Sequence, residues 1–377
     1  MEFVFWMCLI LLIYVYMGYP LLLNILPKNK IVEGEFEELP SVTVIIPAFN
    51  EENVIAATIQ NKLDQNYPKD KVSIIVVSDE SEDETDKIVE AFFKDHSNVK
   101  LIRQIPRKGK TSGLNLAFQE ISSEIIIFSD ANSIFEKDAM KALVNTFTDP
   151  SVGYVTGKMV YVNEDGSMVG DGCSAYMKYE NNMRLLESAI GSIVGVDGGV
   201  DAIRTSLYSE LRADQLPDFV QPLKIVEQHK RVVYQDKAIL TEDSLADQGS
   251  EFRMRVRVSL RALWALSDMK HLLNPFSYGV FSLQLFSHKV LRYLAFVPLV
   301  LAFISNVALL GQGAFYNLAL LTQIAFYLLA LYGNNNADNN KWVGLAHYFC
   351  LINFAAAIAS LRFLKGEKIV IWKPRQG

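Results

Sequence analysis

Three apolar runs in the first half of the chain each end abruptly in polar residues, and this arrangement limits the fold more than any other feature of the sequence. The three runs are Val42–Ile46, Val72–Val77 and Glu124–Phe128. The residues that follow them include Pro47–Glu51, Asp79 and Asp130–Asn132. Open α/β sheets bind ligands at the carboxyl ends of their strands. We therefore expect these polar groups to lie together on the rim of one active site.

Apolar strands alternate with helical patterns through the central part of the chain. The predicted strands are Val42–Ile46, Val72–Val77, Val99–Arg103 and Ile125–Phe128, and the predicted helices are Glu51–Gln65, Asp83–Lys94, Lys110–Ile121 and Lys137–Phe147. Strands at this spacing need right-handed crossovers. The pattern predicts an α/β domain of the nucleotide-binding kind, with a mostly parallel sheet and helices on both faces. Fold alone does not fix the chemistry.

The excess of apolar residues is concentrated at the two ends of the chain. Hydrophobic residues make up 50% of the 377 residues, and the mean hydropathy is +0.17. Residues 3–26 carry no charge between Glu2 and Lys28, and such a stretch is long enough to cross about 30 Å of hydrocarbon. A cleaved signal peptide is the alternative, but it would need basic residues before the apolar core. The lysines here follow the core, which favours an uncleaved transmembrane helix.

Three further apolar runs of near-spanning length lie at 290–310, 315–332 and 343–364. The sequence therefore predicts an integral membrane protein with about four transmembrane helices. Lys28 and Lys30 place the central domain in the cytoplasm, at a cell inner membrane or plasma membrane. Three later spans would put the C-terminus outside, yet Lys365 and other basic residues follow the last one. Either one C-terminal segment is re-entrant or interfacial, or the charge rule is overridden, and both alternatives stay open.

These patterns divide the chain into four expected parts. Residues 1–30 form a transmembrane helix and its flank, 31–270 a cytoplasmic domain, 271–288 an interfacial segment, and 289–377 about three transmembrane helices and a tail. The net charge of −6 gives no support to nucleic-acid binding. The cysteines lack the spacing of a metal site, and we expect them to act as small apolar residues.

Two charged motifs have both a structural and a ligand-binding interpretation. The acidic stretch 79–86 suits a helix N-terminus, but Asp79 itself precedes the cap and stands at the strand tip. A carboxylate there can accept a hydrogen bond from a base or a ribose hydroxyl. The basic segment Arg107–Lys110 suits a diphosphate, and it equally suits a solvated basic turn.

Three other motifs bring further candidates. Asp130 and Asn132 are hard oxygen ligands that can share a divalent cation, or they stabilise a turn at the strand end. Asp218 lies in an apolar neighbourhood, where a partly desolvated carboxylate suits a general base. Arg253 and Arg257 share a helical face that meets a pyrophosphate or lipid headgroups, or that simply lies on the membrane surface.

Together these motifs resemble those of the processive-type, inverting family 2 glycosyltransferases with a GT-A fold, which include the membrane synthases of cellulose, hyaluronan and poly-N-acetylglucosamine. The resemblance runs from about residue 41 to residue 266. It implies a nucleotide-diphospho-sugar transferase domain whose donor is a nucleotide sugar, with a UDP-linked sugar as the first candidate. It also implies a role in polysaccharide synthesis, with membrane lipids as partners. It also implies Mg²⁺ or Mn²⁺ as cofactor. Transfer of one sugar to a lipid acceptor, a polyprenyl phosphate or a glycolipid, is the alternative. A transporter or scaffold that only binds nucleotide is a third class.

The resemblance also implies roles for individual residues. The segments VTVIIPAFNE, SDESEDET, RKGKTSGLN and FSDANS match the family's donor-binding motifs. They assign to the donor site Pro47, Phe49, Glu51, Asp79, Lys110, Asn115 and Asp130. The segment GSIVGVDGGVDAIR assigns to the sugar or acceptor pocket Gly195, Asp197 and Gly198. At the family's D-x-D metal motif the chain has Asp130 and Asn132, so the second carboxylate is replaced by an amide.

Two motifs depart further from the family pattern. In LPDFV, Asp218 matches the catalytic base while Pro217 replaces the first acid of the family's acidic pair. Arg257, with Arg253 nearby, matches the arginine of the Q-x-x-R-W motif, but Met254 and Val258 replace its glutamine and tryptophan. The implied mechanism is a single displacement in which the base takes a proton from the acceptor hydroxyl. The charge of the departing diphosphate is offset by a divalent cation, by Lys110 and by Arg257.

Overall fold

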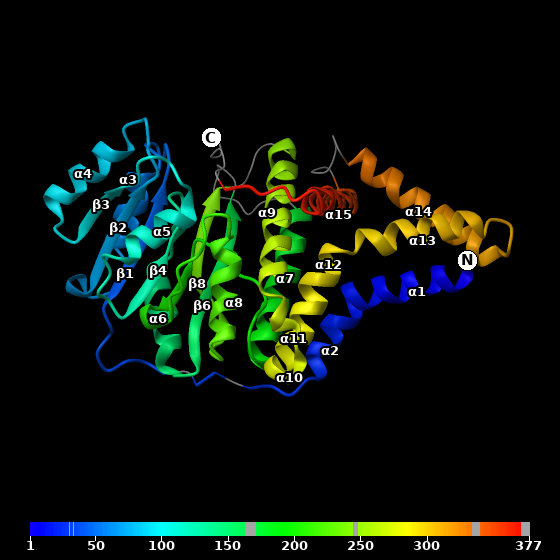
Figure 1. The fold of residues 1–377 in the computed structure, drawn as a ribbon, viewed down its shortest axis with the longest axis horizontal. Helices are drawn as coiled ribbons and strands as arrows, with labels where there is room; N and C mark the ends of the chain where they lie inside the picture. Colours follow the sequence, from blue (N-terminus) through cyan, green and yellow to red (C-terminus); the bar gives the residue numbers. More distant parts are fainter. Residues whose placement is uncertain (30, 33, 163–170, 244–247, 334–339, 371–377) are drawn as a thin grey trace. The chain divides into compact units, whose positions relative to one another are not determined.

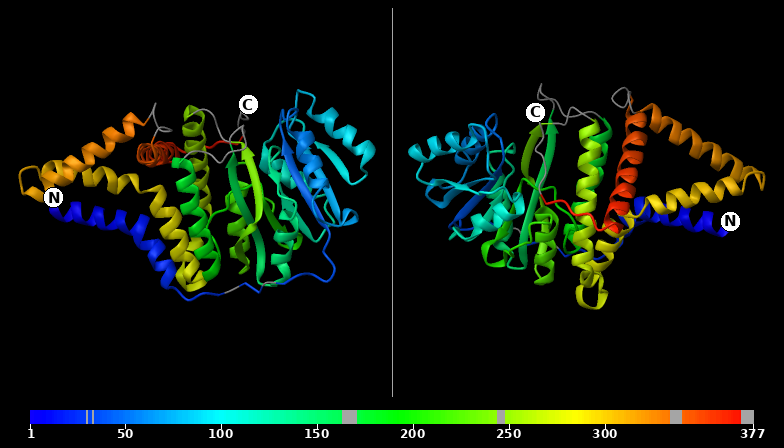
Figure 2. Two further views of the ribbon diagram at one scale, coloured as in Figure 1. Left: turned by 180° about the vertical axis from the view of Figure 1, so that it is seen from behind. Right: turned by 45° about the horizontal axis from the view of Figure 1, so that its top comes forward.

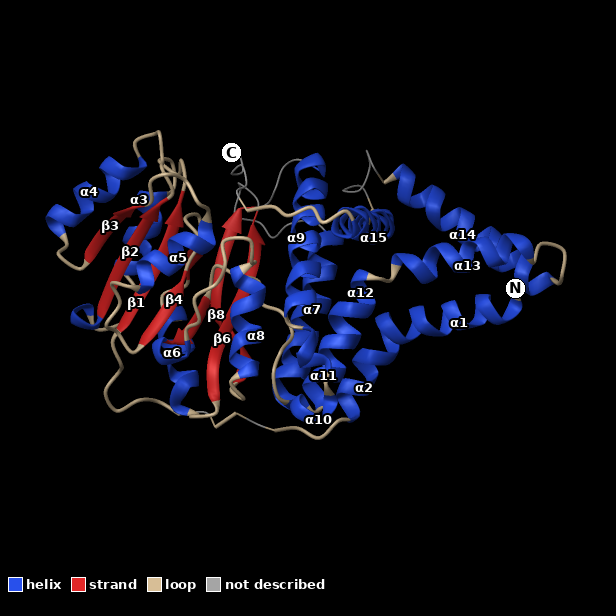
Figure 3. Cartoon of the chain, viewed as in Figure 1, coloured by secondary structure: helices blue, strands red, loops and turns tan. Residues whose placement is uncertain are grey.

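The computed structural model describes residues 1–29, 31–32, 34–162, 171–243, 248–333 and 340–370. The chain divides into two compact units, and each draws on separate stretches of sequence. One unit is built around a sheet, and the other consists of helices (Figure 1, Figure 3). The boundaries expected from the sequence do not follow this division, because residues 31–270 enclose two long helices of the helical unit, α7 (Asp171–Ile190) and α9 (Gln248–Asp268).

Within the part of the chain that the structure describes, the sheet unit contains eight strands in the order β3-β2-β1-β4-β7-β6-β8-β5. The strands are β1 (Val42–Ala48), β2 (Val72–Ser78), β3 (Val99–Arg103), β4 (Ile125–Phe128), β5 (Ile134–Phe135), β6 (Val152–Val162), β7 (Asp201–Arg204) and β8 (Arg231–Asp243). The first four pair in parallel, as predicted. The sheet then becomes mixed, because β7 is antiparallel to both of its neighbours, β4 and β6.

Helices cover both faces of this sheet, as the alternating pattern predicted. The helices are α3 (Ile55–Leu63), α4 (Thr85–Asp95), α5 (Lys110–Phe118), α6 (Ala139–Asn145) and α8 (Pro217–Glu227). Alternate residues of β1, beginning with Val42 and Val44, join a core with side chains of α3, α4 and α6. On the opposite face, α5 lies close to β2 at Gly113 and α8 lies close to β6 at Gly153. The parallel strands are therefore buried on both faces, which is why they read as unbroken apolar runs.

Gly157 lies where β6 and β8 shift register, and the space around it admits no side chain. A Cβ atom there would lie 2.3 Å from the Ala238 carbonyl oxygen and 2.9 Å from Val200. We expect Gly157→Ala to lower the free energy of unfolding by about 3 kcal/mol, because relieving the overlap must displace a strand. Gly191→Ala is the matched control, since a Cβ at Gly191 meets nothing within 4 Å. Denaturant unfolding that affects both variants equally would contradict this prediction.

Among its described residues, the helical unit contains three helical segments that are long and apolar enough to cross a membrane. They are Glu2–Ile25, Ala314–Tyr332 and Trp342–Leu364. The first comprises α1 (Glu2–Ile13), the π-helical turn η1 (Tyr14–Gly18) and α2 (Tyr19–Ile25). The other two correspond to α14 (Ala314–Tyr332) and α15 (Lys341–Leu364). Figure 2 shows α15 beside α9 in this unit.

The span predicted at 290–310 is not one straight helix. A first helical segment, Val280–Tyr293, comprises α11 (Val280–Leu285), the π-helical turn η6 (Phe286–Val290) and α12 (Leu291–Tyr293). It meets α13 (Phe296–Ala308) at an angle of 56°. Pro298 lies in the first turn of α13 and cannot donate a backbone hydrogen bond to the preceding turn, which accounts for a break at this point. The pair is a broken span or a re-entrant segment. The short elements η5 (Lys270–Leu273) and α10 (Pro275–Tyr278) precede it.

Candidate active site

Lys110 joins two of the carboxylates that the sequence singled out. Its Nζ atom lies 2.8 Å from Asp130 Oδ1 and 3.1 Å from Asp218 Oδ1. Lys110 begins α5, Asp130 follows β4, and Asp218 is in the first turn of α8. Burial by itself would lower the pKa of Lys110, but the two carboxylates outweigh it and the pKa is raised. Lys110 is therefore a fixed cation at the carboxyl end of the parallel strands.

Two glycines pack directly against these carboxylates. Gly198 has φ +80°, and a Cβ there would lie 3.1 Å from Asp218 Cγ. Gly199 has φ +76°, and its Cβ would lie 3.4 Å from Asp130 Oδ2. Left-handed backbone and close approach both favour glycine at these positions. The structure thus brings Gly198, a predicted site residue, to the carboxylate of Asp218.

Asp79 holds the loop that leads into α5. Its side chain accepts hydrogen bonds from the backbone N–H groups of Lys108 (2.9 Å) and Gly109 (3.0 and 3.1 Å). Its Oδ2 also accepts from Arg107 Nε at 3.2 Å. The Arg107 guanidinium carbon lies 3.4 Å from the centre of the Phe49 ring. Asp79, Phe49 and the basic loop therefore form one assembly beside Lys110.

Other predicted site residues have structural contacts of their own. The Asn115 side chain donates to the Leu211 carbonyl at 2.7 Å and accepts from Tyr208 Oη at 2.9 Å, so it holds the loop before α8. Asn132 Nδ2 donates to Glu242 Oε1 at 2.8 Å. The predicted roles of these two residues toward a ligand stay predictions.

The remaining predicted residues lie in both units. In the sheet unit, Pro47 belongs to β1, and the backbone N–H of Glu51 donates to Thr85 Oγ1 at 2.8 Å. Gly195 and Asp197 lie in the segment that leads into β7. Arg253 and Arg257 lie on α9 of the helical unit.

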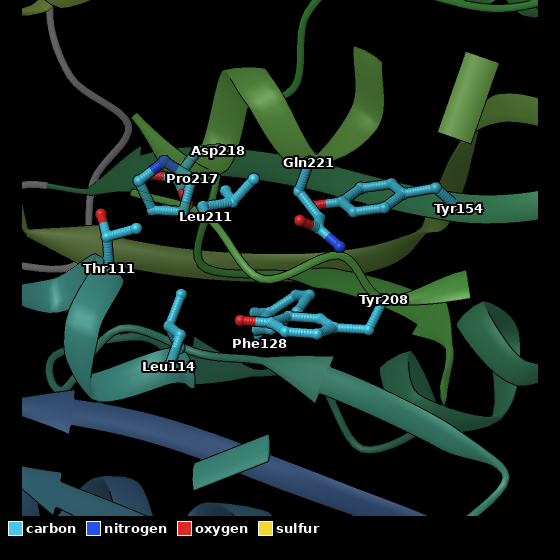
Figure 4. A pocket seen from close by; sticks show the side chains of 9 residues that line it. All are labelled: Thr111, Leu114, Phe128, Tyr154, Tyr208, Leu211, Pro217, Asp218 and Gln221. Carbon is cyan, nitrogen blue, oxygen red and sulfur yellow. The ribbon is translucent and has the colours of Figure 1, made fainter. Parts of the chain in front are cut away.

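A small cavity of about 10 Å³ reaches Asp218 from between α5 and α8 (Figure 4). Its wall includes Tyr154, Tyr208, Phe128 and Gln221. The volume suits about one water molecule. None of these side chains except Asp218 was identified from the sequence, since aromatic residues within strands and loops read there as ordinary core.

Asp201 is a buried carboxyl that the sequence did not reveal. It is fully buried on β7, where it pairs with Phe128 of β4 and Thr156 of β6. Burial raises its pKa to about 7, an effect that the Thr156 hydroxyl opposes and the charge of Asp218 reinforces. The signal in the sequence was one acid directly before the apolar pair Ala202 and Ile203.

This raised pKa predicts a pH dependence of stability. Between about pH 4 and pH 7 the folded chain keeps the Asp201 proton that the unfolded chain releases, so stability falls as pH rises through this window. Through this group the wild type should lose on the order of 2 kcal/mol of unfolding free energy between pH 5 and pH 8. Asp201→Asn should lack this part of the loss. Denaturant unfolding at both pH values measures it, with exposed Asp95→Asn as control. Parallel profiles for wild type and Asp201→Asn would contradict the prediction.

Part of the chain is similar to known glycosyltransferases. Residues 43–195 match the family model described as glycosyl transferase family 2. A probable glycosyltransferase, YdaM, from Bacillus subtilis is 40% identical over 131 residues, which cover 34% of this chain and 31% of YdaM. The poly-beta-1,6-N-acetyl-D-glucosamine synthase of Staphylococcus epidermidis is 23% identical over 185 residues, which cover 49% of this chain and 44% of the synthase. The chain thus spans between about a third and a half of the length of these curated relatives.

A solved structure resembles the chain over nearly its full length. The mannosyltransferase PcManGT from Pyrobaculum calidifontis, solved in complex with GDP-Man and Mn²⁺, has a TM-score of 0.74 at 21% identity. The match covers 96% of this chain and 99% of PcManGT. At this identity the likeness shows the fold, which is the GT-A fold that the sequence predicted. Over residues 43–195, the chain is thus similar to the glycosyl transferase family 2 model.

Proposed function

We propose that this chain transfers a sugar from a nucleotide sugar to a hydroxyl acceptor, with inversion, at a membrane. The observation that carries the proposal is the contact of Lys110 with both Asp130 and Asp218 at the strand ends. A cation between two carboxylates, beside a basic loop, suits a reaction in which a diphosphate leaves and a hydroxyl attacks. The lysines that follow the first span favour a cytoplasmic location for this site.

The donor side of the site is proposed to be the assembly of Asp79, Phe49 and the loop at Arg107–Lys110. The aromatic ring offers a flat face for a base, and the Asp79 carboxylate can accept from a base or a ribose hydroxyl. The guanidinium of Arg107 covers that ring. We infer that the base displaces the guanidinium from the ring and that Arg107 then turns toward the diphosphate.

Asp218 is proposed as the general base, since it is the carboxylate in the first turn of α8 and is partly exposed beside Lys110. A base in this role typically contributes about 10²–10⁴-fold to the rate. Lys110 stays protonated because both carboxylates stabilise its charge, so it can offset charge that develops on the departing diphosphate. Such electrostatic stabilisation is usually the largest single contribution to catalysis.

An Mg²⁺ or Mn²⁺ ion is part of the proposal. Within the described residues, no three His, Cys, Asp or Glu side chains group together in a way that could hold a metal ion. Asp130 and the amide oxygen of Asn132 fit a cation that takes most of its ligands from diphosphate oxygens and water, as Mg²⁺ does. A bound cation would neutralise diphosphate charge. Asp130 would then hold the cation in place of its contact with Lys110.

The acceptor is proposed to be a growing glycan, in keeping with the name of the Staphylococcus epidermidis relative. Gly195, Asp197 and Gly198 are proposed to shape the sugar or acceptor pocket, and Arg253 and Arg257 to serve the diphosphate. Transfer of a single sugar to a lipid acceptor remains the second candidate. Mass spectrometry of the product separates the two, because a polymer gives a ladder of sugar additions and single transfer gives one.

The experiment that tests the proposed function uses the full chain, purified in detergent, and a panel of UDP- and GDP-linked sugars. Release of nucleoside diphosphate is measured with and without a chelator. We expect one donor to be consumed in the presence of an acceptor extract, and the chelator to slow its consumption. No turnover of any donor by protein that still binds nucleotide would contradict the proposal. Full activity in chelator would remove the cation from it.

A further inference from the structure

A second and larger cavity lies wholly within the helical unit. Its volume is about 100 Å³, and α9, α15, α7 and the turns η1 and η6 contribute to its wall. The wall includes three basic side chains, from Arg255, Lys289 and Arg292. The hydroxyl of Tyr176 and the amide of Asn353 also belong to it. About 10–15 Å³ suffices for one water molecule on the same measure, so this cavity has room for a small oxyanion together with water.

Positive charge exceeds negative charge around this cavity. Glu180 is the acidic residue among the described wall residues, and it pairs with Arg292. Just outside the wall, Glu251 pairs with Arg255 at 2.7 Å, and Glu187 and Arg184 lie close to Lys289. The described wall thus brings three basic side chains and one carboxylate to the cavity. Basic donors that converge in this way suit an anionic ligand.

The carboxylates are engaged by the wall itself. Glu187 is fully buried, accepts from Tyr19 Oη at 2.7 Å and lies 2.7 Å from His288 Nδ1. His288 Nε2 lies 3.2 Å from Glu180 Oε2. The Arg292 guanidinium lies within 6 Å of the rings of three tyrosines, among them Tyr176. These contacts fix the wall, so the cavity is pre-organised and does not depend on a ligand to shape it.

Both π-helical turns of the described chain contribute to this one cavity. Turn η1 supplies Tyr16, and turn η6 supplies His288 and Lys289. The turns touch each other through the hydroxyls of Tyr14 and Ser287, 2.8 Å apart. π-helical turns are rare, and they occur frequently at functional sites. Lys289 also lies in a helical segment apolar enough for a membrane, where an ionisable side chain indicates a functional site.

We propose that this cavity binds a phosphate-class oxyanion through Arg255, Lys289, Arg292 and Tyr176. Guanidinium, ammonium and hydroxyl groups that converge on a cavity are the donors that recognise phosphate oxygens. Candidate spans contribute to the wall through Tyr16 and Asn353, so the phosphate of an anionic lipid headgroup is the expected form of the ligand. The proposal concerns the helical unit alone and does not depend on sugar transfer.

The test measures lipid binding to the purified, delipidated full chain by native mass spectrometry. The probes are dioleoyl phosphatidic acid, dioleoylglycerol, which lacks the phosphate, and inorganic phosphate as competitor. We expect one copy of phosphatidic acid to bind saturably and dioleoylglycerol not to bind at this site. Lys289→Gln should weaken phosphatidic acid binding about tenfold or more, because it removes a charged donor. Lys289→Arg keeps the charge and should retain binding.

The control and the contrary outcomes follow from the position of each residue. Lys270→Gln removes an exposed cation of the helical unit and should leave binding unchanged. If Lys289→Gln does not fold, Ser259→Leu fills the cavity from α9 and should abolish binding. If inorganic phosphate competes with phosphatidic acid, the site binds both free and lipid-borne phosphate. If inorganic phosphate does not compete, the site is specific for the lipid-borne phosphate. Equal binding of both lipids, or binding unchanged in Lys289→Gln and Ser259→Leu, would overturn the proposal.

Discussion

Asp218→Asn is expected to reduce sugar transfer about 10²–10⁴-fold while nucleotide binding stays unchanged. The amide keeps the shape of the side chain, and its oxygen can still accept from Lys110 Nζ, which lies 3.1 Å from Asp218 Oδ1 in the native chain. What the variant lacks is a group that can take the proton of the acceptor hydroxyl. The loss should therefore appear in the rate of transfer and not in the affinity for nucleotide.

Initial rates of transfer and calorimetric binding of nucleoside diphosphate measure the two effects separately. Asp214→Asn is a close control, because Asp214 lies in the turn just before α8 but pairs with Arg212 at 3.2 Å and with Lys368. We expect this control to retain transfer. Transfer by Asp218→Asn at the native rate would mean that another group takes the proton, and Asp218 would then be left only as a partner of Lys110.

The first half of the sheet was predictable from sequence because its strands are buried on both faces. Strands β1 and β2 were each placed to within two residues of their observed ends, since a parallel strand covered by helices reads as a continuous apolar run. The second half gave no such signal. Strand β7 has only four residues, and β8 mixes charged and apolar residues along its length. Their pairing with strands that are distant in the chain also leaves no local pattern.

The division into units was hidden for a different reason. Helices α7 and α9 are amphipathic and charged, so they read as parts of a polar central domain, yet each packs against α15 at the far end of the sequence. Similarly, the span predicted at 290–310 took no account of Pro298, which accounts for the break near Leu294. Hydropathy reports that a segment is apolar, but it does not report how the segment bends.

The residues of the candidate site were identified from motifs, and the sequence also predicted that they meet at one rim, but it did not predict their individual contacts. Lys110, Asp130 and Asp218 were each identified from a motif, while the contact of Lys110 with a residue 108 positions away follows only from the fold. Asn115 shows the opposite case. Its motif indicated a ligand contact, and the structure shows its amide holding a loop, which a motif cannot distinguish from ligand binding.

Removing the cation at the centre of the site is expected to have the second large effect. In Lys110→Met, the side chain keeps its length but no charge remains between Asp130 and Asp218. We expect kcat/KM for transfer to fall about 10²–10³-fold, the loss that follows removal of one preorganised group that stabilises charge in the transition state. Lys110→Arg retains the charge and should retain part of the activity. Lys100→Met, which breaks an exposed pair with Glu120, should retain nearly all of it.

The pH dependence of the same variant distinguishes a catalytic role of Lys110 from a structural one. Without the ammonium group, two neighbouring carboxylates repel each other, and one of them keeps its proton to higher pH. A protonated base is inactive, so the acidic limb of the pH–rate profile should move to higher pH in Lys110→Met and stay in place in Lys110→Arg. If Lys110 served only to hold α5 and α8 together, its loss would lower the thermal stability and leave the position of the acidic limb unchanged. Because Asp201 also titrates near neutral pH, the profile should be repeated in the Asp201→Asn background. A shift that survives there belongs to the carboxylates that Lys110 bridges.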